Sequence, residues 1–342
     1  MLLETKSAPA AVERLLTKSG AAIVALARVL IAAQVRTAVT VARGSSDHAA
    51  GHLGYLLMSR MGLLTTSLPP SVITLHQAPI SGSGVAALSF SQSGQSPDIV
   101  ATMAALGSGA GSGSGSGGAI TAAFVNDTAS PLASTVRYVI DLQAGAEQSV
   151  AATKSFITQL VAGLSLYAAW AEHGDLRVAL PTLPEMLRAA ADCDWSPAIE
   201  VLRDADQMFV IGRGTSLAIA AEMALKFKEV CGIQAEAFSA AEIKHGPMAL
   251  IEAGYPVLVI APRGPEQAEL LALADALRER GAHVLLAAAS SATGLPVVIG
   301  AHELLDTVAI MQSFYPMVES LARVRGYDPD RPPHLQKVTR TT

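Results

Sequence analysis

The sequence predicts an α/β fold built from two similar domains, each a parallel sheet flanked by helices. Hydrophobic residues make up 51% of the 342 residues and aromatic residues only 4%, so the core is aliphatic, as is typical of buried parallel strands. Short aliphatic runs alternate with helical stretches of about 10–20 residues, which is the pattern of βαβ units. The strand and glycine turn at 39–46 return at 208–216. Such an internal repeat indicates a duplication.

Each half of the sequence opens in the same way. Val39–Ala42 is an apolar strand that runs into the turn Arg43–Ser46 and then into a helix over Asp47–Met61. Met208–Ile211 repeats the strand, and Leu217–Val230 repeats the helix after a second glycine turn. The remaining aliphatic runs, which we interpret as strands, are Val85–Phe90, Ile120–Val125 and Val136–Leu142 in the first half and Pro256–Ala261, His283–Ala287 and Val297–Ile299 in the second.

The domain boundaries follow from breaks in this pattern. We expect a first domain over residues 1–180 with an N-terminal helix, and a second over residues 198–342 with a C-terminal tail. Residues 181–197 are the expected linker, because prolines bracket a short helix there. Gly107–Gly118 is almost pure glycine and serine, and we interpret it as a flexible surface loop without chemistry of its own.

Composition excludes several classes of partner. The net charge of -5 gives no general attraction to nucleic acid or to an anionic membrane, so local groups must hold any anionic ligand. Cys193 and Cys231 are the only cysteines, and neither has the Cys/His spacing of a zinc site. No signal-peptide pattern is present, and the apolar segment Ala21–Val35 is too short to span a bilayer. We therefore expect a cytoplasmic protein with two reduced thiols and no metal.

The turn Ser91–Ser96 is a candidate phosphate site. It follows a buried strand and precedes a helix that begins near Pro97, where backbone N–H groups favour an anion. Its serine hydroxyls and Gln92 add donors without adding net charge. Ordinary helix capping by serine or aspartate would explain the same residues. The neighbouring turn with Ser45 and Ser46 strengthens the phosphate interpretation.

A nicotinamide-binding interpretation of the glycine turns fails on spacing. Gly212 and Gly214 begin a dinucleotide-like pattern, but Ala218 stands where the third glycine could be. No acidic residue closes the next strand at the expected place.

Lys226 and Glu229 are candidate catalytic residues. They are three positions apart and so share one face of a predicted helix. On an arbitrary helix they would form a solvated ion pair, but apolar residues flank them here. A glutamate buried near a lysine can have its pKa tuned for proton transfer. Lys228 points away from this pair and is expected at the surface.

Three further segments carry candidate polar groups. His245 precedes Gly246-Pro247, which stops a helix and presents the imidazole at its end. The loop 144–154 enters a long apolar helix, which Thr153 or Ser149 is expected to cap. The polar tail around Lys337 is either a frayed terminus or a segment that folds over a site.

Taken in order, these segments resemble the sugar isomerase (SIS) domain family, in particular the isomerase half of glucosamine-6-phosphate synthase. The resemblance covers nearly the whole chain. It rests on Arg43–Ser46, Ser91–Gly94, Ala144–Glu147 with Thr153-Lys154, Ala224–Glu229, Glu242–Pro247 and Leu335–Lys337. It implies two flavodoxin-like SIS domains, and a homodimer whose active site is built from both subunits.

The resemblance also implies a role for each candidate residue. Glu229 would move a proton between C1 and C2 of a sugar phosphate, and Lys226 would support that transfer. His245, supplied from the neighbouring subunit, would assist ring opening, and Lys337 would close the site. The residues that would bind the substrate and its phosphate are Ser45, Ser46, Ser91, Gln92, Ser93, Ser96 and Val150.

The sequence departs from the family pattern at positions that bear on the sugar contacts. Gln95 replaces a glutamate, Arg43 replaces a small residue or cysteine, and Ala152 replaces a serine. We expect no preceding glutaminase domain.

The resemblance therefore implies a deaminase that converts glucosamine 6-phosphate to fructose 6-phosphate and ammonia, without a metal or redox cofactor. The alternatives are a galactosamine-6-phosphate deaminase, an aldose–ketose phosphosugar isomerase, and a non-catalytic sugar-phosphate sensor. A DNA-binding regulator is disfavoured, because the residues before the first strand carry no basic patch.

Overall fold

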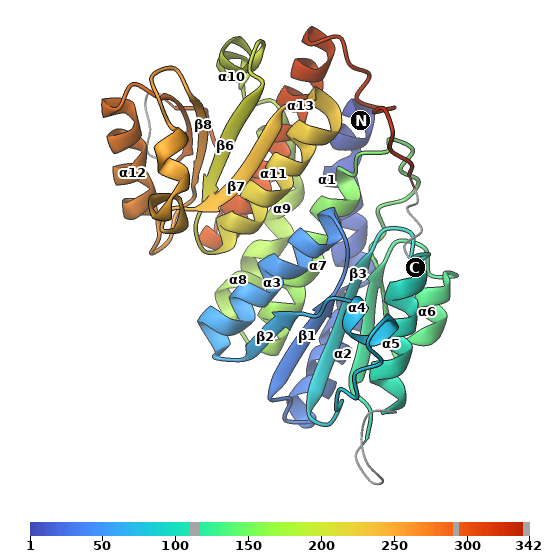
Figure 1. Ribbon diagram of the computed structural model, residues 1–342. Coiled ribbons are helices and arrows are strands. Elements are labelled where there is room, and N and C mark those ends of the chain that lie inside the picture. The colour runs from blue at the N-terminus through green and yellow to red at the C-terminus, as the bar shows by residue number, and fades with distance from the viewer. Residues whose placement is uncertain (110–116, 290–293, 338–342) are drawn as a thin grey trace. The chain divides into compact units, whose positions relative to one another are not determined.

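The computed structural model describes residues 1–109, 117–289 and 294–337 (Figure 1). The chain divides into two compact units whose segments interleave along the sequence. The five-stranded unit comprises Ala11–Ala146, Thr158–Val178 and the residues from Gln336 onward, and the four-stranded unit comprises Met1–Ala10, Glu147–Ile157 and Ala179–Leu335. The expected boundaries at 180 and 198 stay a prediction. Within the Gly107–Gly118 stretch, residues 110–116 lie outside the described part of the chain.

The five-stranded unit is a parallel sheet with helices between its strands. Its strands are β1 (Thr37–Val41), β2 (Leu64–Ser67), β3 (Val85–Ser91), β4 (Ile120–Val125) and β5 (Tyr138–Asp141). Its helices are α2 (Gly20–Ala32), α3 (Ser45–Met61), α4 (Ser71–Thr74), α5 (Pro97–Ser108) and α6 (Pro131–Thr135). Three helices have residues in both units or end at their boundary, namely α1 (Leu2–Lys18), α7 (Lys154–Trp170) and α8 (Gly174–Ala179).

The strand order of this sheet is β2-β1-β3-β4-β5, and every pairing is parallel. The order reverses between β1 and β3, where Val41 lies opposite Ser89. In open α/β sheets of this order, ligands bind beyond the carboxyl ends of the strands at the reversal. The turns Arg43–Ser46 and Gln92–Ser96 follow these two strands and therefore lie at that edge.

The core of the five-stranded unit is aliphatic, as composition predicts. Alternate residues of the central strands, such as Val39, Ala87 and Ala123, face the buried side of α5. Ile99 and Met103 on α5 complete this layer. This packing fixes the position of α5, whose N-terminus receives the serine-rich turn.

The four-stranded unit repeats the arrangement. Its strands are β6 (Gln207–Gly212), β7 (Gln234–Ser239), β8 (Pro256–Ala261) and β9 (His283–Ala288), in the order β7-β6-β8-β9. Its longer helices are α9 (Leu183–Ala191), α10 (Ser196–Leu202), α11 (Thr215–Cys231), α12 (Gln267–Glu279) and α13 (Asp306–Val324). Its short 3₁₀ helices are η1 (Leu180–Thr182), η2 (Glu242–His245), η3 (Pro247–Leu250) and η4 (Glu303–Leu305). Its core joins β6, β8 and α12 through Ile211, Val259 and Leu270.

The two glycine turns have the same backbone geometry. Gly44 precedes α3 with φ 54° and ψ −133°, and Gly214 precedes α11 with φ 64° and ψ −134°. Only glycine adopts these dihedral angles without strain. The duplication and the predicted α/β class are both confirmed.

One predicted strand is wrong. Val297–Ile299 forms no strand, and the described sheet contact in this region is a single bridge between Ala287 and Leu295. Pro296 has no N–H for a sheet hydrogen bond, and its carbonyl accepts from the indole of Trp195 at 2.8 Å. The strands β2 and β7 were not predicted, because their sequences are partly polar.

Neither cysteine forms a disulfide, as expected.

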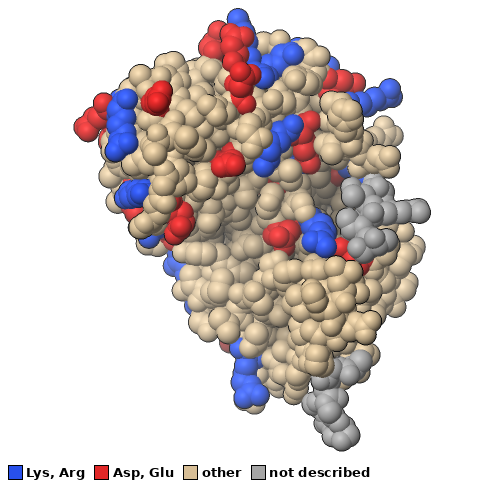
Figure 2. All heavy atoms as spheres, viewed as in Figure 1, with Lys and Arg blue, Asp and Glu red and all other residues tan. Residues whose placement is uncertain are grey.

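No single helix among the described residues is long and apolar enough to cross a membrane, although α1 and α2 together meet the criteria of length and composition as a bent pair. On the face drawn in Figure 2, acidic and basic side chains are interspersed among many uncharged residues.

Candidate functional site

The turn after β1 offers serine groups at the start of α3. Ser45 is the first residue of α3, and both Ser45 and Ser46 are half-buried. The Ser46 hydroxyl accepts a hydrogen bond from Nε2 of Gln159 on α7 at 2.9 Å. Gln159 was missed at the sequence level, where the only signal was a polar residue within an apolar helix. Its side-chain oxygen is buried and makes no hydrogen bond within the described structure.

The turn after β3 is held by its own hydroxyl groups. The Ser91 hydroxyl accepts from the Gly94 amide at 2.9 Å, and the Ser93 hydroxyl accepts from the Gln95 amide at 3.3 Å. Because both oxygens act as acceptors, the hydrogen of each hydroxyl stays available to a ligand. Ser96 is the N-cap residue of α5, but its side chain makes no capping hydrogen bond. The capping explanation therefore does not account for Ser96.

Gly94 is required by the geometry of this turn. Its φ is +63°, and a Cβ atom there would lie 2.2 Å from Oγ of Ser130. Ser130 caps α6 by accepting from the Ala133 amide at 3.3 Å. The serine turn is thus packed against a second helix start, which limits its movement.

In the four-stranded unit, Lys226 lies between two carboxylates of α11. Its ammonium nitrogen is 2.5 Å from Oε2 of Glu229 and 3.3 Å from Oε1 of Glu222. The Lys226 and Glu222 side chains are fully buried, whereas that of Glu229 is 21% exposed. Glu222 was missed at the sequence level, although its i,i+4 spacing to Lys226 was a signal. The expected ion pair of Lys226 and Glu229 is present, and its more deeply buried member is the lysine.

The two carboxylates keep Lys226 charged. Burial by itself lowers the pKa of the ammonium group, but Glu222 and Glu229 more than offset this effect, and the pKa is raised above its usual value. Tyr315 of α13 is also fully buried near these acids. Burial, together with the charges of Glu222, Glu147 and Glu229, raises the pKa of Tyr315 well above its usual value. This region therefore combines a buried cation with a neutral phenol.

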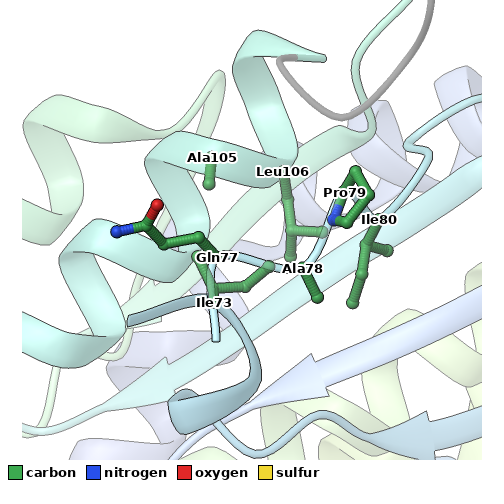
Figure 3. A pocket seen from close by; sticks show the side chains of 7 residues that line it. All are labelled: Ile73, Gln77, Ala78, Pro79, Ile80, Ala105 and Leu106. Carbon is green, nitrogen blue, oxygen red and sulfur yellow. The ribbon is translucent and has the colours of Figure 1, made fainter. Parts of the chain in front are cut away.

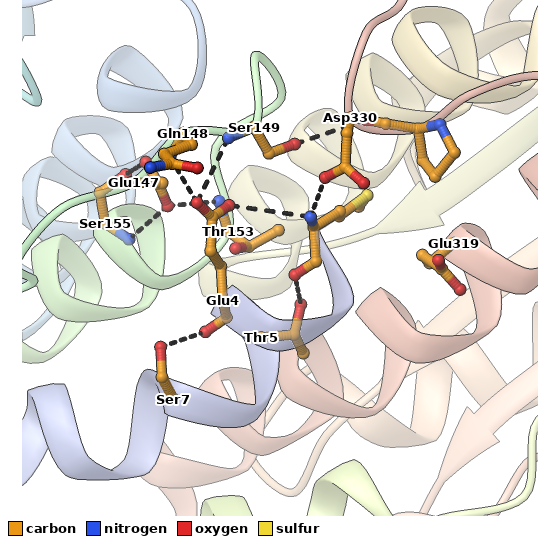
Figure 4. Close-up of polar contacts among 12 residues, drawn as sticks. Glu4, Thr5, Ser7, Glu147, Gln148, Ser149, Thr153, Ser155, Glu319 and Asp330 are labelled. Atoms are coloured by element: carbon orange, nitrogen blue, oxygen red, sulfur yellow. Dashed lines mark hydrogen bonds and ion pairs between the residues drawn. The ribbon is translucent and has the colours of Figure 1, made fainter.

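Glu147 caps α7 (Figure 4), and the expected cap by Thr153 is wrong, because its hydroxyl makes no hydrogen bond among the described residues. The alternative cap by Ser149 stays a prediction. Oε1 of Glu147 accepts from the Thr153 amide at 3.0 Å and the Ser155 amide at 3.1 Å. Oε2 accepts from the Ser155 hydroxyl at 2.6 Å. A carboxylate is favoured over a hydroxyl here because it satisfies two amides and interacts with the positive end of the helix dipole.

Val150 lies in the wall of a cavity of about 930 Å³ in the four-stranded unit. Its amide donates to the Asp330 carbonyl at 3.3 Å. Glu4 closes one side of the cavity by accepting from the Gln148 and Ser149 amides (Figure 4). The polar side chains of Glu319 and Arg323 also line it.

The remaining candidate residues are placed as follows. His245 is exposed and ends η2, where Gly246 has φ +138° and Pro247 begins η3, so the predicted local geometry is confirmed. Lys228 is exposed, as predicted. Lys337 is half-buried and belongs to the five-stranded unit, whereas Lys226, Glu229, His245 and Val150 belong to the four-stranded unit.

A second cavity lies away from the serine turn. It measures about 240 Å³ and is lined mostly by apolar side chains of α5 and of the segment around α4 (Figure 3). Ala105 and Leu106, which line it, are near the C-terminal end of α5, while the serine turn is at its N-terminus. Within the described ranges, no three His, Cys, Asp or Glu side chains are grouped so that they could hold a metal ion.

Comparison with known proteins gives a consistent result. A family model described as the SIS domain matches residues 31–169 and 201–318. The glutamine–fructose-6-phosphate aminotransferase [isomerizing] of Aeropyrum pernix is 34% identical over 319 residues, which cover 87% of this chain and 50% of that protein. The chain thus spans about half the length of the curated relatives it matches.

Two solved structures share the fold over nearly their full length. A protein provisionally assigned as a phosphosugar isomerase from Silicibacter pomeroyi is 42% identical, with a TM-score of 0.90, and the match covers 96% of this chain and 99% of that one. A glucosamine-6-phosphate deaminase from Thermotoga maritima is 21% identical, with a TM-score of 0.77 and coverage of 99% of both chains. At that identity the second likeness shows the fold alone.

Proposed function

Because the chain belongs to the SIS domain family, we propose that it is an aminosugar-phosphate deaminase that converts glucosamine 6-phosphate and water to fructose 6-phosphate and ammonia. The observation that carries the proposal is the Glu229 carboxylate, partly exposed and held at 2.5 Å by the buried Lys226 ammonium. A carboxylate positioned in this way can take up and return a proton without leaving its place.

Glu229 is the proposed proton carrier. In the open-chain form of the substrate, its carboxylate removes the proton from C2 while O1 takes up a proton from water, which gives an enolamine. The carboxylate then delivers its proton to C1 as the amino group gives up one N–H proton to water. The product is an imine at C2, which water hydrolyses to a ketone with release of ammonia. Lys226 stays protonated because of its raised pKa, so its role is to orient Glu229 and to donate hydrogen bonds near C1.

The serine turn is the proposed phosphate site. The hydroxyl groups of Ser46, Ser91, Ser93 and Ser96, the amide of Gln92 and the N-termini of α3 and α5 offer donors at the strand-order reversal. Ser45 belongs to the same turn. Phosphate binding at a distance from C1 and C2 would help to orient the substrate.

The other roles carry over from the family resemblance as part of the same proposal. His245 from a neighbouring subunit of a homodimer would assist ring opening, Val150 would contact the sugar, and Lys337 would close the site. The name of the Aeropyrum pernix relative supports fructose 6-phosphate as one of the two sugar phosphates.

The test is to incubate the purified protein with glucosamine 6-phosphate and to assay ammonia and fructose 6-phosphate in the same tube. Equal amounts of both products are expected. Conversion of a neutral aldose phosphate without ammonia from any aminosugar phosphate would replace the proposal with an aldose–ketose isomerase. Binding of fructose 6-phosphate without any turnover would replace it with a sensor.

A further inference from the structure

Arg43 lies in the turn between β1 and α3, and its side chain contacts the first turn of α5. Its Nε and Nη2 atoms donate to Oδ2 of Asp98 at 3.1 and 2.8 Å. Asp98 is the second residue of α5, and its side chain is only 2% exposed. Its other oxygen accepts from the Ile99 amide at 2.8 Å. The guanidinium group is therefore fixed beside the N-terminus of the helix that follows the serine turn.

The pair has the right charge and exposure to contact an anion. An unpaired Asp98 carboxylate would repel a phosphate at this helix start, and Arg43 offsets that charge. The Arg43 side chain is 48% exposed. A guanidinium has five N–H donors, and the two bonds to Asp98 are the ones that Arg43 makes within the described residues. Both hydrogens of Nη1 are thus left for a ligand.

The four-stranded unit contains the corresponding bridge in a different setting. Arg213 follows β6, and its Nη1 donates to Oε1 of Glu269, in the first turn of α12, at 2.8 Å. There, however, the Glu266 carboxylate covers the glycine turn, since a Cβ on Gly214 would lie 2.5 Å from its Oε1. An internal carboxylate occupies the position next to this turn that a bound anion would take. Arg213 is therefore a matched control for Arg43.

We propose that Arg43, oriented by Asp98, is a ligand of the substrate phosphate and adds a cationic contact to an otherwise uncharged serine turn. The proposal rests on the proposed function, because it names a further group in the same phosphate site. The planar guanidinium suits a phosphate because it can donate two parallel hydrogen bonds to it. The family resemblance implies a small residue or cysteine at this position, and Arg43 departs from that pattern.

The first experiment measures binding of fructose 6-phosphate and of inorganic phosphate by calorimetry. Arg43→Gln is expected to raise both dissociation constants about 10–100-fold, as for loss of a charge-assisted hydrogen bond. In turnover of glucosamine 6-phosphate, KM should rise by a similar factor while kcat stays within about threefold. Arg213→Gln breaks the matched bridge in the other unit and should leave both dissociation constants unchanged. Equal effects of the two variants would overturn the proposal.

A double variant separates direct contact from charge compensation. Arg43→Gln together with Asp98→Asn removes the guanidinium and also the buried carboxylate that it offsets, so this variant avoids an unpaired buried charge. If Arg43 contacts the phosphate, affinity stays weakened. Recovery of wild-type affinity would mean that Arg43 only neutralises Asp98, and the proposal would be wrong.

The same data distinguish this inference from the proposed function. An active enzyme whose Arg43→Gln variant binds fructose 6-phosphate as tightly as the wild type would keep the function and remove Arg43 from the site. A protein that releases no ammonia but loses fructose 6-phosphate affinity on Arg43→Gln would keep the phosphate contact and remove the deaminase assignment.

Discussion

The ammonium nitrogen of Lys226 lies 2.5 Å from Oε2 of Glu229, one turn further along α11. The lysine is fully buried, whereas the glutamate side chain is 21% exposed. A charged lysine is costly to bury unless it is paired, and here Glu222 supplies a second carboxylate from the preceding turn. The pair thus fixes one oxygen of Glu229, while the glutamate side chain as a whole stays partly exposed at the surface of its unit.

Replacing Glu229 by glutamine tests the proton carrier. The variant keeps the size and most hydrogen bonds of the side chain but cannot accept the C2 proton, so kcat should fall by about 10²–10⁴-fold. Binding of fructose 6-phosphate, measured by calorimetry, should change little. Glu236→Gln makes the same chemical change at an exposed position of β7 and should have wild-type activity. Undiminished turnover in Glu229→Gln would remove Glu229 from the mechanism.

Replacing Lys226 by methionine tests the buried ion pairs. The change leaves Glu222 buried without its cation, and we expect the free energy of unfolding in urea to fall by about 3–5 kcal/mol. Arg203→Met breaks the exposed pair with Glu200, which should cost less than about 1 kcal/mol. Adding Glu222→Gln to the Lys226→Met variant should recover part of the loss. A Lys226→Met protein as stable as the wild type would contradict this account.

Gly94 and Gly62 form a matched pair for testing the serine turn. Both have φ near +63°, but a Cβ at Gly62 meets nothing within 4 Å, whereas one at Gly94 would lie 2.2 Å from Ser130 Oγ. Gly62→Ala should therefore cost only the strain of the left-handed backbone, about 1 kcal/mol. Gly94→Ala should cost clearly more and also raise KM, since the turn must move. Equal costs for the two variants in urea unfolding would show that the contact with Ser130 is not restrictive.

His52 of α3 should make the stability of the protein depend on pH. Burial lowers its pKa from 6.5 to about 4. Between these values the unfolded chain binds a proton that the folded chain does not, so the free energy of unfolding falls as the pH decreases from 6.5 to 4. The full effect is about 3 kcal/mol. The free energy of unfolding, measured in urea at several pH values across this range, should change less with pH in His52→Gln than in the wild type. An unchanged dependence on pH would mean that His52 is not the group responsible.

The fold could be predicted from local pattern to a large extent. Ile120–Val125 and Pro256–Ala261 are strands with the expected bounds, because central strands of a parallel sheet are buried on both faces and read as aliphatic runs. Leu64–Ser67 and Gln234–Ser239 could not be found in this way, since polar residues interrupt their apolar runs. Val297–Ile299 read as a strand, but neighbouring Pro296 and its contact with Trp195 decide otherwise.

The sequence alone is enough to predict the duplicated α/β architecture and the residue types of the candidate site, because hydrophobic period, glycine turns and helix spacing are local properties. It placed Lys226 and Glu229 on one helix face for the same reason. The tertiary structure decided that Glu222 shares Lys226, that Gln159 binds Ser46, and that Arg43 is held by Asp98. The last two contacts join residues 113 and 55 positions apart, so only the packed chain defines them. Packing also buries Lys226 beside two carboxylates, and these carboxylates keep it charged.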